Sequence, residues 1–221
     1  MISLVKSLKA GLGIYSPEEA AFYARIPAAT MRRWVAENDV IRQSPDQAPV
    51  TFIDFVQAMA IRSIRARHSV SLQKIRAAVE AARIRGVTDI FARKHTTYWD
   101  GKEIHIQEAD GNFRQMTGRH ADQTSWRPIV ELYMRDLTYG ADGLACHYDA
   151  FSWKDCAIEM RPAERFGEPM VKSCGYTARV LWEACEAEGT VEGAAQAFGV
   201  TVEEAECAAR YYDYLTTKIA A

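Results

Sequence analysis

The sequence predicts an α+β fold that is mainly helical and is built from three modules. Apolar residues recur at helical spacing near both ends of the chain, whereas the middle holds short β-prone runs separated by tight-turn pairs such as Asp100-Gly101. We therefore expect an N-terminal domain at 1–95, a small antiparallel β element serving as linker or dimerisation region at 96–160, and a three-helix module at 161–221.

The first module begins with signals for two helices joined by a turn. Ser16 can cap a helix whose first residue is Pro17, and Glu19 completes a capping box. Residues 25–27 (Arg-Ile-Pro) interrupt this helix, because a residue that precedes proline avoids the α region. A second helix begins near Pro27, and this order of signals is typical of a DNA-reading helix-turn-helix.

The second helix separates an apolar side from two arginines. Met31, Trp34 and Val35 can dock on the first helix and leave the guanidinium groups free. Each guanidinium can bind guanine O6 and N7 as a pair, or clamp phosphate. The predicted DNA-binding residues are Thr30, Arg32 and Arg33 on this helix, Arg25 in the turn, and Arg42 and Gln43 in the loop that follows. The alternative is an ordinary two-helix corner with a solvated arginine pair.

A predicted wing and two further helices complete the module. The β-prone runs 40–41 and 50–52 flank a polar, proline-bearing loop at 42–49. Helical spacing then runs through 53–64, and Ser71 can cap another helix that reaches about residue 82.

Charge divides the chain unequally. Residues 1–95 hold 15 Lys and Arg against 8 Asp and Glu, whereas residues 96–221 hold 12 against 21. A basic domain neutralises DNA phosphates, and an acidic one is repelled by them and suits protein contacts. The alternative is that solvated helices simply carry uneven charge.

These motifs, with Thr-Met-Arg-Arg-Trp in the second helix and SVSLQKIRAAVEAAR at 69–83, resemble the MerR-type winged helix-turn-helix over residues 14 to about 86. The turn of that family usually carries a glycine. Here Arg25-Ile26 stands there, so a left-handed residue would be strained. The resemblance implies sequence-specific binding to double-stranded operator DNA. We expect a homodimer, because one winged helix reads only a half-site.

The middle region is predicted to begin with a small β-meander, with strands near 97–99, 104–106 and 109–113. A helix is expected over 128–137, because Ile129, Leu132, Tyr133 and Leu137 fall on one stripe. Two further strands are expected near residues 146 and 158. His95, His105, His120 and His147 have no partners at ligand spacing, so no metal site and no cofactor are expected.

The last module contains three helical segments, 177–187, 190–198 and 201–215, separated by Gly189 and Gly199. This is again a helix-turn-helix pattern. Residues 177–221 hold 3 Lys and Arg against 8 Asp and Glu, so phosphate would repel it. We expect this module to contact protein.

The segment from Arg161 to Leu215 is similar to the family called domain of unknown function 433; the residues that fit are Phe166, Gly167, Pro169, Gly175, Thr177, Ala195 and Gly199. Arg161-Pro162 stands where that family usually has Asp-Pro, and Cys174 replaces a small residue. With a winged helix in front, the chain looks like the VapB-type antitoxins. That resemblance implies a partner toxin, typically a PIN-like ribonuclease with an acidic, metal-binding active site, and repression of the shared operon. The residues expected to contact toxin carboxylates are Lys172, Arg179 and Arg210.

Other function classes have less support in the sequence. No GxSxG, P-loop, HExxH or glycine-rich dinucleotide signature occurs, so we expect no catalytic residues and no enzyme. A stand-alone MerR-like regulator that responds to a small effector or a protein partner is the alternative function. No apolar run reaches the roughly 20 residues of a membrane span, and the first residues do not suit a secretion signal. We therefore expect a cytoplasmic protein. The five cysteines are odd in number and widely spaced, so we expect reduced, mostly structural thiols.

Overall fold

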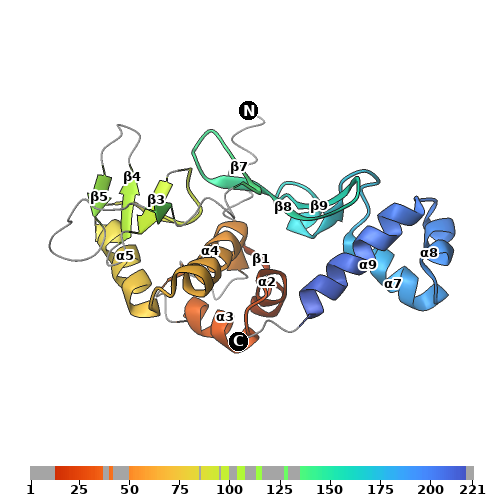
Figure 1. The fold of residues 1–221 in the computed structure, drawn as a ribbon, viewed down its shortest axis with the longest axis horizontal. Helices are drawn as coiled ribbons and strands as arrows, with labels where there is room; N and C mark the ends of the chain where they lie inside the picture. Colours follow the sequence, from red (N-terminus) through yellow and green to blue (C-terminus); the bar gives the residue numbers. More distant parts are fainter. Residues whose placement is uncertain are drawn as a thin grey trace. The chain divides into compact units, whose positions relative to one another are not determined.

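The structure, a computed structural model, describes residues 13–36, 40–41, 50–84, 86–94, 96–99, 104–107, 113–115, 127–128 and 135–217. The fold is α+β, with helices and small antiparallel sheets (Figure 1), which confirms the predicted class. The described part of the chain divides into two compact units, one that ends at residue 145 and one that begins at residue 146. The predicted three-module boundaries at 95 and 160 stay predictions.

The N-terminal unit opens with strand β1 (Gly13–Tyr15), helix α2 (Pro17–Ala24) and helix α3 (Ala28–Ala36). The capping box at Ser16 is confirmed: the Glu19 amide donates to Ser16 Oγ at 3.1 Å, and the Ser16 amide donates to Glu19 Oε2 at 2.8 Å. Arg25 ends α2 in the left-handed conformation, with φ 53° and ψ 48°. The turn therefore uses a left-handed residue without glycine, a conformation that glycine adopts at lower cost.

Strand β2 (Val50–Thr51) pairs antiparallel with β1 and leads into helices α4 (Phe52–His68) and α5 (Leu72–Ile84). Thr51 caps α4 in a second box with Asp54, and this one is buried. The predicted strand at 40–41 is wrong, because these residues lie in a bend; their side chains are buried, which accounts for the apolar signal. The predicted wing loop, 42–49, lies outside the described residues.

A four-stranded sheet follows in the same unit. Its strand order is β5-β4-β3-β6, formed by β3 (Thr96–Trp99), β4 (Ile104–Gln107), β5 (Phe113–Gln115) and β6 (Arg127–Pro128). The antiparallel pairings of β3 with β4 and of β4 with β5 confirm the predicted meander. The helix predicted over 128–137 falls mostly outside the described residues, but Leu137 belongs to strand β7 (Leu137–Tyr139).

A second sheet has the strand order β10-β9-β8-β7. Strands β8 (Ala145–Trp153) and β9 (Cys156–Met160) confirm the strands predicted near 146 and 158, and the short β10 (Met170–Val171) pairs antiparallel with β9. In the antiparallel β8–β9 pair, Tyr148 lies opposite Met160 and Asp149 lies opposite Glu159, and the register shifts between Asp149 and Phe151.

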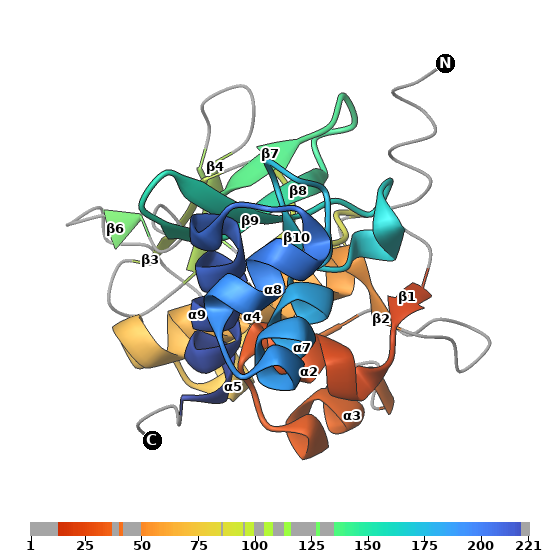
Figure 2. The same ribbon diagram turned by 90° about the vertical axis from the view of Figure 1, so that its right-hand side faces the viewer.

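Between β9 and β10, the one-turn helix η1 (Arg165–Gly167) holds three successive residues at positive φ. The chain then enters helices α7 (Ala178–Glu188), α8 (Val191–Phe198) and α9 (Val202–Thr216), which pack against one another (Figure 2) and confirm the predicted three-helix module. Trp182 of α7 stacks on Tyr212 of α9 with ring centroids 4.6 Å apart. A small-residue core lies between the helices: Ala184, Cys185, Ala194, Ala195 and Ala205. Across the described part of the chain, no helix is both long and apolar enough to cross a membrane.

Candidate DNA-binding and partner-binding surfaces

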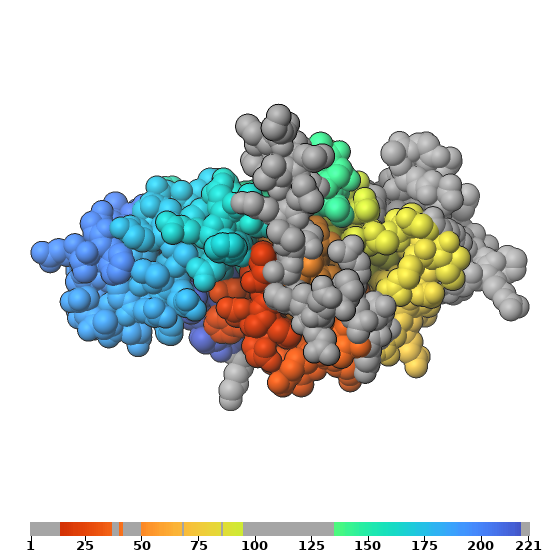
Figure 3. Space-filling view, turned by 180° about the vertical axis from the view of Figure 1, so that it is seen from behind, coloured from red at the N-terminus to blue at the C-terminus, as the bar shows by residue number. Residues whose placement is uncertain are grey.

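Helix α3 has the two-sided character expected of a groove-binding helix. Met31 and Trp34 are 0% and 1% exposed, whereas Arg32 and Arg33 are exposed. The predicted separation of a buried apolar side from two solvent-exposed arginines is therefore present. The segment from α2 to α3, coloured red in Figure 3, lies at the surface of its unit. The capped α2 supports α3, since the two helices are in contact.

The two arginines differ in their surroundings. Arg32 Nη1 lies 3.4 Å from Glu18 Oε1 of α2, and these side chains are 61% and 55% exposed. Such an exposed pair contributes at most about 1 kcal/mol, so it restrains Arg32 only weakly. Among the described residues no ion pair involves Arg33. Both guanidinium groups can therefore reach an anionic ligand at little cost.

The other predicted DNA-binding residues that the structure describes, Thr30 and Arg25, are less exposed than Arg32 and Arg33. Thr30 is half-buried in the first turn of α3, and its amide donates to the carbonyl of Pro27. Arg25 is half-buried in the turn between the helices. Arg42 and Gln43 lie outside the described residues. The structure thus brings Thr30, Arg32 and Arg33 onto one helix, with Arg25 just before it.

Sequence reasoning missed two cations in this unit. Arg65 and Arg67 lie exposed in the last turn of α4. Their spacing in the sequence, beside Arg62, was the available signal. They add to the basic character of the N-terminal unit and are further candidates for phosphate contacts.

The three predicted partner-binding cations are not equivalent. Arg210 lies 3.8 Å above the Trp153 ring centroid and donates to Glu206 Oε1 from Nη2 at 2.8 Å, so its guanidinium is already engaged. Arg179 is 52% exposed and only loosely paired, at 3.8 Å from both Glu168 and Glu183. The predicted role therefore suits Arg179 better than Arg210.

Lys172 is exposed at an open cavity of about 680 Å³ in the C-terminal unit. The cavity lies between β9, η1 and β10, and its charged lining consists of Glu159, Arg161, Glu164, Arg165 and Lys172. The described residues that line this cavity do not include Arg179 or Arg210. The structure therefore places Lys172 with Arg161 and Arg165, two cations that sequence reasoning did not select.

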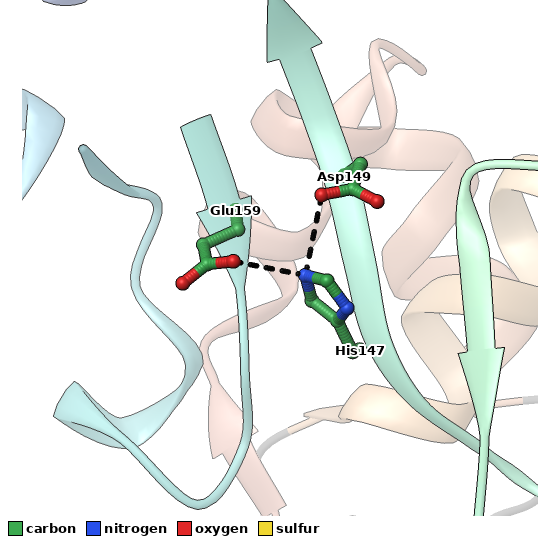
Figure 4. A group of neighbouring side chains, drawn as sticks. All are labelled: His147, Asp149 and Glu159. Atoms are coloured by element: carbon green, nitrogen blue, oxygen red, sulfur yellow. Dashed lines mark ion pairs between the residues drawn. The ribbon is translucent and has the colours of Figure 1, made fainter. Parts of the chain in front are cut away.

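A group of titratable side chains lies on the β8–β9 pair (Figure 4). His147 Nε2 is 3.1 Å from Glu159 Oε2 and 3.3 Å from Asp149 Oδ1. Arg161 Nη2 donates to Glu159 Oε2 at 2.8 Å. Burial alone would lower the pKa of Arg161, but the carboxylates of Glu159 and Glu164 together outweigh it and raise that pKa. The expectation that His147 has no neighbours of ligand type is wrong, because its neighbour Glu159 comes from the paired strand and is twelve positions away in the sequence.

Comparison with known proteins gives a distant but nearly full-length match. No family model matches the chain. The chain is 21% identical, over 226 residues, to a Mycobacterium tuberculosis (strain ATCC 25618 / H37Rv) protein named "Putative antitoxin VapB45", with 89% of this chain and 92% of that protein covered. It also resembles the X-ray crystal structure of Rv2018 from Mycobacterium tuberculosis, with a TM-score of 0.64 at 18% identity over 89% of this chain and 97% of that one. The structural match confirms the fold, and the sequence match supports an antitoxin-like identity.

Proposed function

We propose that this protein is a DNA-binding transcriptional regulator that acts as the antitoxin of a toxin–antitoxin pair. A homodimer binds operator DNA through its N-terminal units and represses its own operon, while the C-terminal module binds and neutralises a PIN-like ribonuclease. The observation that carries the DNA-binding part is α3, an anchored helix with Arg32 and Arg33 exposed and Thr30 in its first turn.

The chemistry of α3 suits the major groove. Buried Met31 and Trp34 hold the helix by its apolar side, so the arginines are presented from a rigid element. Arg32 and Arg33 read or clamp the DNA, and Thr30 reaches a base edge or a phosphate. Arg65 and Arg67 add phosphate contacts that position the protein without reading sequence.

The C-terminal module suits a protein partner. Residues 177–221 carry an excess of acidic side chains, which phosphate repels. The nearby cations Lys172 and Arg179 are exposed. Among the described residues Lys172 has no ion pair, and Arg179 is paired only loosely, so both can bind carboxylates of a partner. A ribonuclease that binds a metal ion through acidic residues offers such carboxylates, and occupying them excludes its RNA substrate.

A stand-alone regulator is the second candidate. The open cavity of about 680 Å³ has both cations and carboxylates in its lining and is large enough for a small effector. This candidate predicts that DNA affinity changes with a small molecule and that no toxin is needed.

A reporter assay tests the DNA-binding part. The DNA upstream of the gene drives a reporter in cells that express the full chain. The wild-type chain should repress the reporter, and the Arg32→Ala/Arg33→Ala variant should not, although it is present at the same level. Equal repression by both would rule out α3 as the reading helix. Arg83→Ala on α5, an exposed arginine already paired with Glu80, is the matched control and should repress normally.

A further inference from the structure

One face of the β8–β9 pair gathers ligand-type side chains by strand geometry alone. Alternate residues of a strand point to the same face, so His147 and Asp149 share a face of β8. Glu159 of β9 lies directly opposite Asp149 in the antiparallel register and therefore joins them. Three potential ligands thus come together without any loop having to fold around them.

Their separations fit a single metal ion. His147 Nε2 lies 3.1 Å from Glu159 Oε2 and 3.3 Å from Asp149 Oδ1, and the three ligand atoms are all within 4.8 Å of one another (Figure 4). Ligands held about 2.0–2.2 Å from one ion lie about 3.0–3.4 Å apart in octahedral or tetrahedral geometry. The two shorter separations need almost no adjustment.

The electrostatics of the pair favour a cation at this position. Asp149 and Glu159 are carboxylates directly opposite each other, an arrangement that destabilises a sheet unless a positive charge lies between them. Glu159 is only 2% exposed, and a buried carboxylate needs compensation. Arg161, shared between Glu159 and Glu164, balances one negative charge. Each carboxylate oxygen has two lone pairs, so Glu159 Oε2 can accept from Arg161 and still bind a metal ion.

We propose that His147, Asp149 and Glu159 bind one divalent transition-metal ion. One imidazole with two carboxylates suits Zn²⁺ or Mn²⁺ better than Ca²⁺ or Mg²⁺, which take oxygen ligands alone. Water completes the coordination. Glu159 also lines the open cavity of about 680 Å³, and the Asp149 side chain is 47% exposed, so an ion can enter from solvent. The ion joins β8 to β9, and Arg161 orients the Glu159 carboxylate.

The test is metal titration of the full-length chain, prepared without a polyhistidine tag and stripped with chelator. Loss of the free Mn²⁺ electron paramagnetic resonance signal measures Mn²⁺ binding, and calorimetry measures Zn²⁺ binding. The wild-type chain should bind one equivalent of each ion. Asp149→Asn and His147→Gln should each weaken binding at least tenfold, since even outer-shell changes cost about 10–100-fold.

Asp155→Asn is the matched control, because this exposed carboxylate lies in the β8–β9 turn outside the cluster and should leave binding unchanged. Circular dichroism without metal checks that each variant is folded. The proposal is overturned if the wild-type chain binds neither ion, or if the folded variants at 147 and 149 bind as tightly as the wild type. The five cysteines are free thiols, which bind Zn²⁺ but do not favour Mn²⁺, so the Mn²⁺ titration reports on the His147 cluster alone.

Discussion

Arg32 and Arg33 should contribute unequally to DNA binding, although they are neighbours on α3. Arg32 has to leave Glu18 before it contacts DNA, whereas Arg33 has no ion pair to break among the described residues. A bidentate arginine–guanine contact contributes about 1–3 kcal/mol. The exposed pair with Glu18 offsets about 0.2–1 kcal/mol of this for Arg32.

Three variants follow from these magnitudes. Arg33→Ala should cost about 1–3 kcal/mol of binding free energy, Arg32→Ala somewhat less, and the double variant on the order of 2–6 kcal/mol. Glu18→Gln removes the competing carboxylate and should tighten binding by up to about 1 kcal/mol, or about fivefold. Glu18 is not part of the capping box, which uses Glu19, so α2 should remain folded in this variant.

Fluorescence anisotropy with DNA from upstream of the gene measures these affinities at several salt concentrations. Each lost phosphate contact should reduce the slope of log affinity against log salt by about 0.9. Arg83→Ala, with its guanidinium paired to Glu80, is the control and should change affinity little. The reasoning is refuted if the double variant binds like the wild type. If Glu18→Gln binds DNA no more tightly than the wild type, and Arg32→Ala costs as much binding free energy as Arg33→Ala, then Glu18 does not compete with DNA for Arg32.

Three further predictions concern stability. Thr51→Ala should lower the free energy of unfolding by about 2–4 kcal/mol, because it removes a helix cap and a hydrogen bond to the buried Asp54 carboxylate. Ser16→Ala removes a more exposed cap and should cost about 1 kcal/mol; urea unfolding of both variants measures the two losses, and equal losses would contradict the prediction. Ser69 ends α4 at φ 52°, so Ser69→Gly should stabilise by up to about 1 kcal/mol in thermal denaturation, and a loss would argue against strain there. The Ser173 hydroxyl, more than the contacts with Thr201, lowers the pKa of Glu204, so this stabilisation is present at neutral pH and is lost as pH falls through that lowered pKa. Ser173→Ala should therefore lower the melting temperature at about pH 6, with the difference from wild type shrinking toward about pH 3; a difference independent of pH would exclude this linkage.

Features that depend on nearby residues could be predicted from the sequence. The box at Ser16 and Glu19 needs residues only three apart, and Thr201 with Glu204 repeats the arrangement. Gly189 and Gly199 end α7 and α8 in the left-handed conformation that glycine adopts most easily. The apolar side of α3 likewise follows from helical spacing. These signals are local, so they persist whatever the rest of the chain does.

Features that depend on pairing between distant segments could not be predicted. Val50–Thr51 pairs with β1, a partner that helical and turn signals do not identify, while the run at 40–41 is buried without forming a strand. Arg210 is covered by Trp153 from another element, which makes it a poor candidate for partner binding. The His147 cluster depends on the β8–β9 register, including the shift after Asp149. A single sequence contains no information on register beyond the alternation of side chains.

The central proposal, that this protein is an antitoxin as well as a DNA-binding regulator, is tested most directly by purification from the native host after nuclease treatment. The full-length chain carries a small affinity tag and is compared with Lys172→Glu/Arg179→Glu and with Lys94→Glu, an exposed lysine of the N-terminal unit that serves as control. The account predicts that a small protein with ribonuclease activity co-purifies with the wild type and the control. It should be depleted with the double variant, and adding back the wild-type chain should inhibit it. Recovery of the chain alone, still able to bind its upstream DNA, would contradict the antitoxin role and leave a stand-alone regulator.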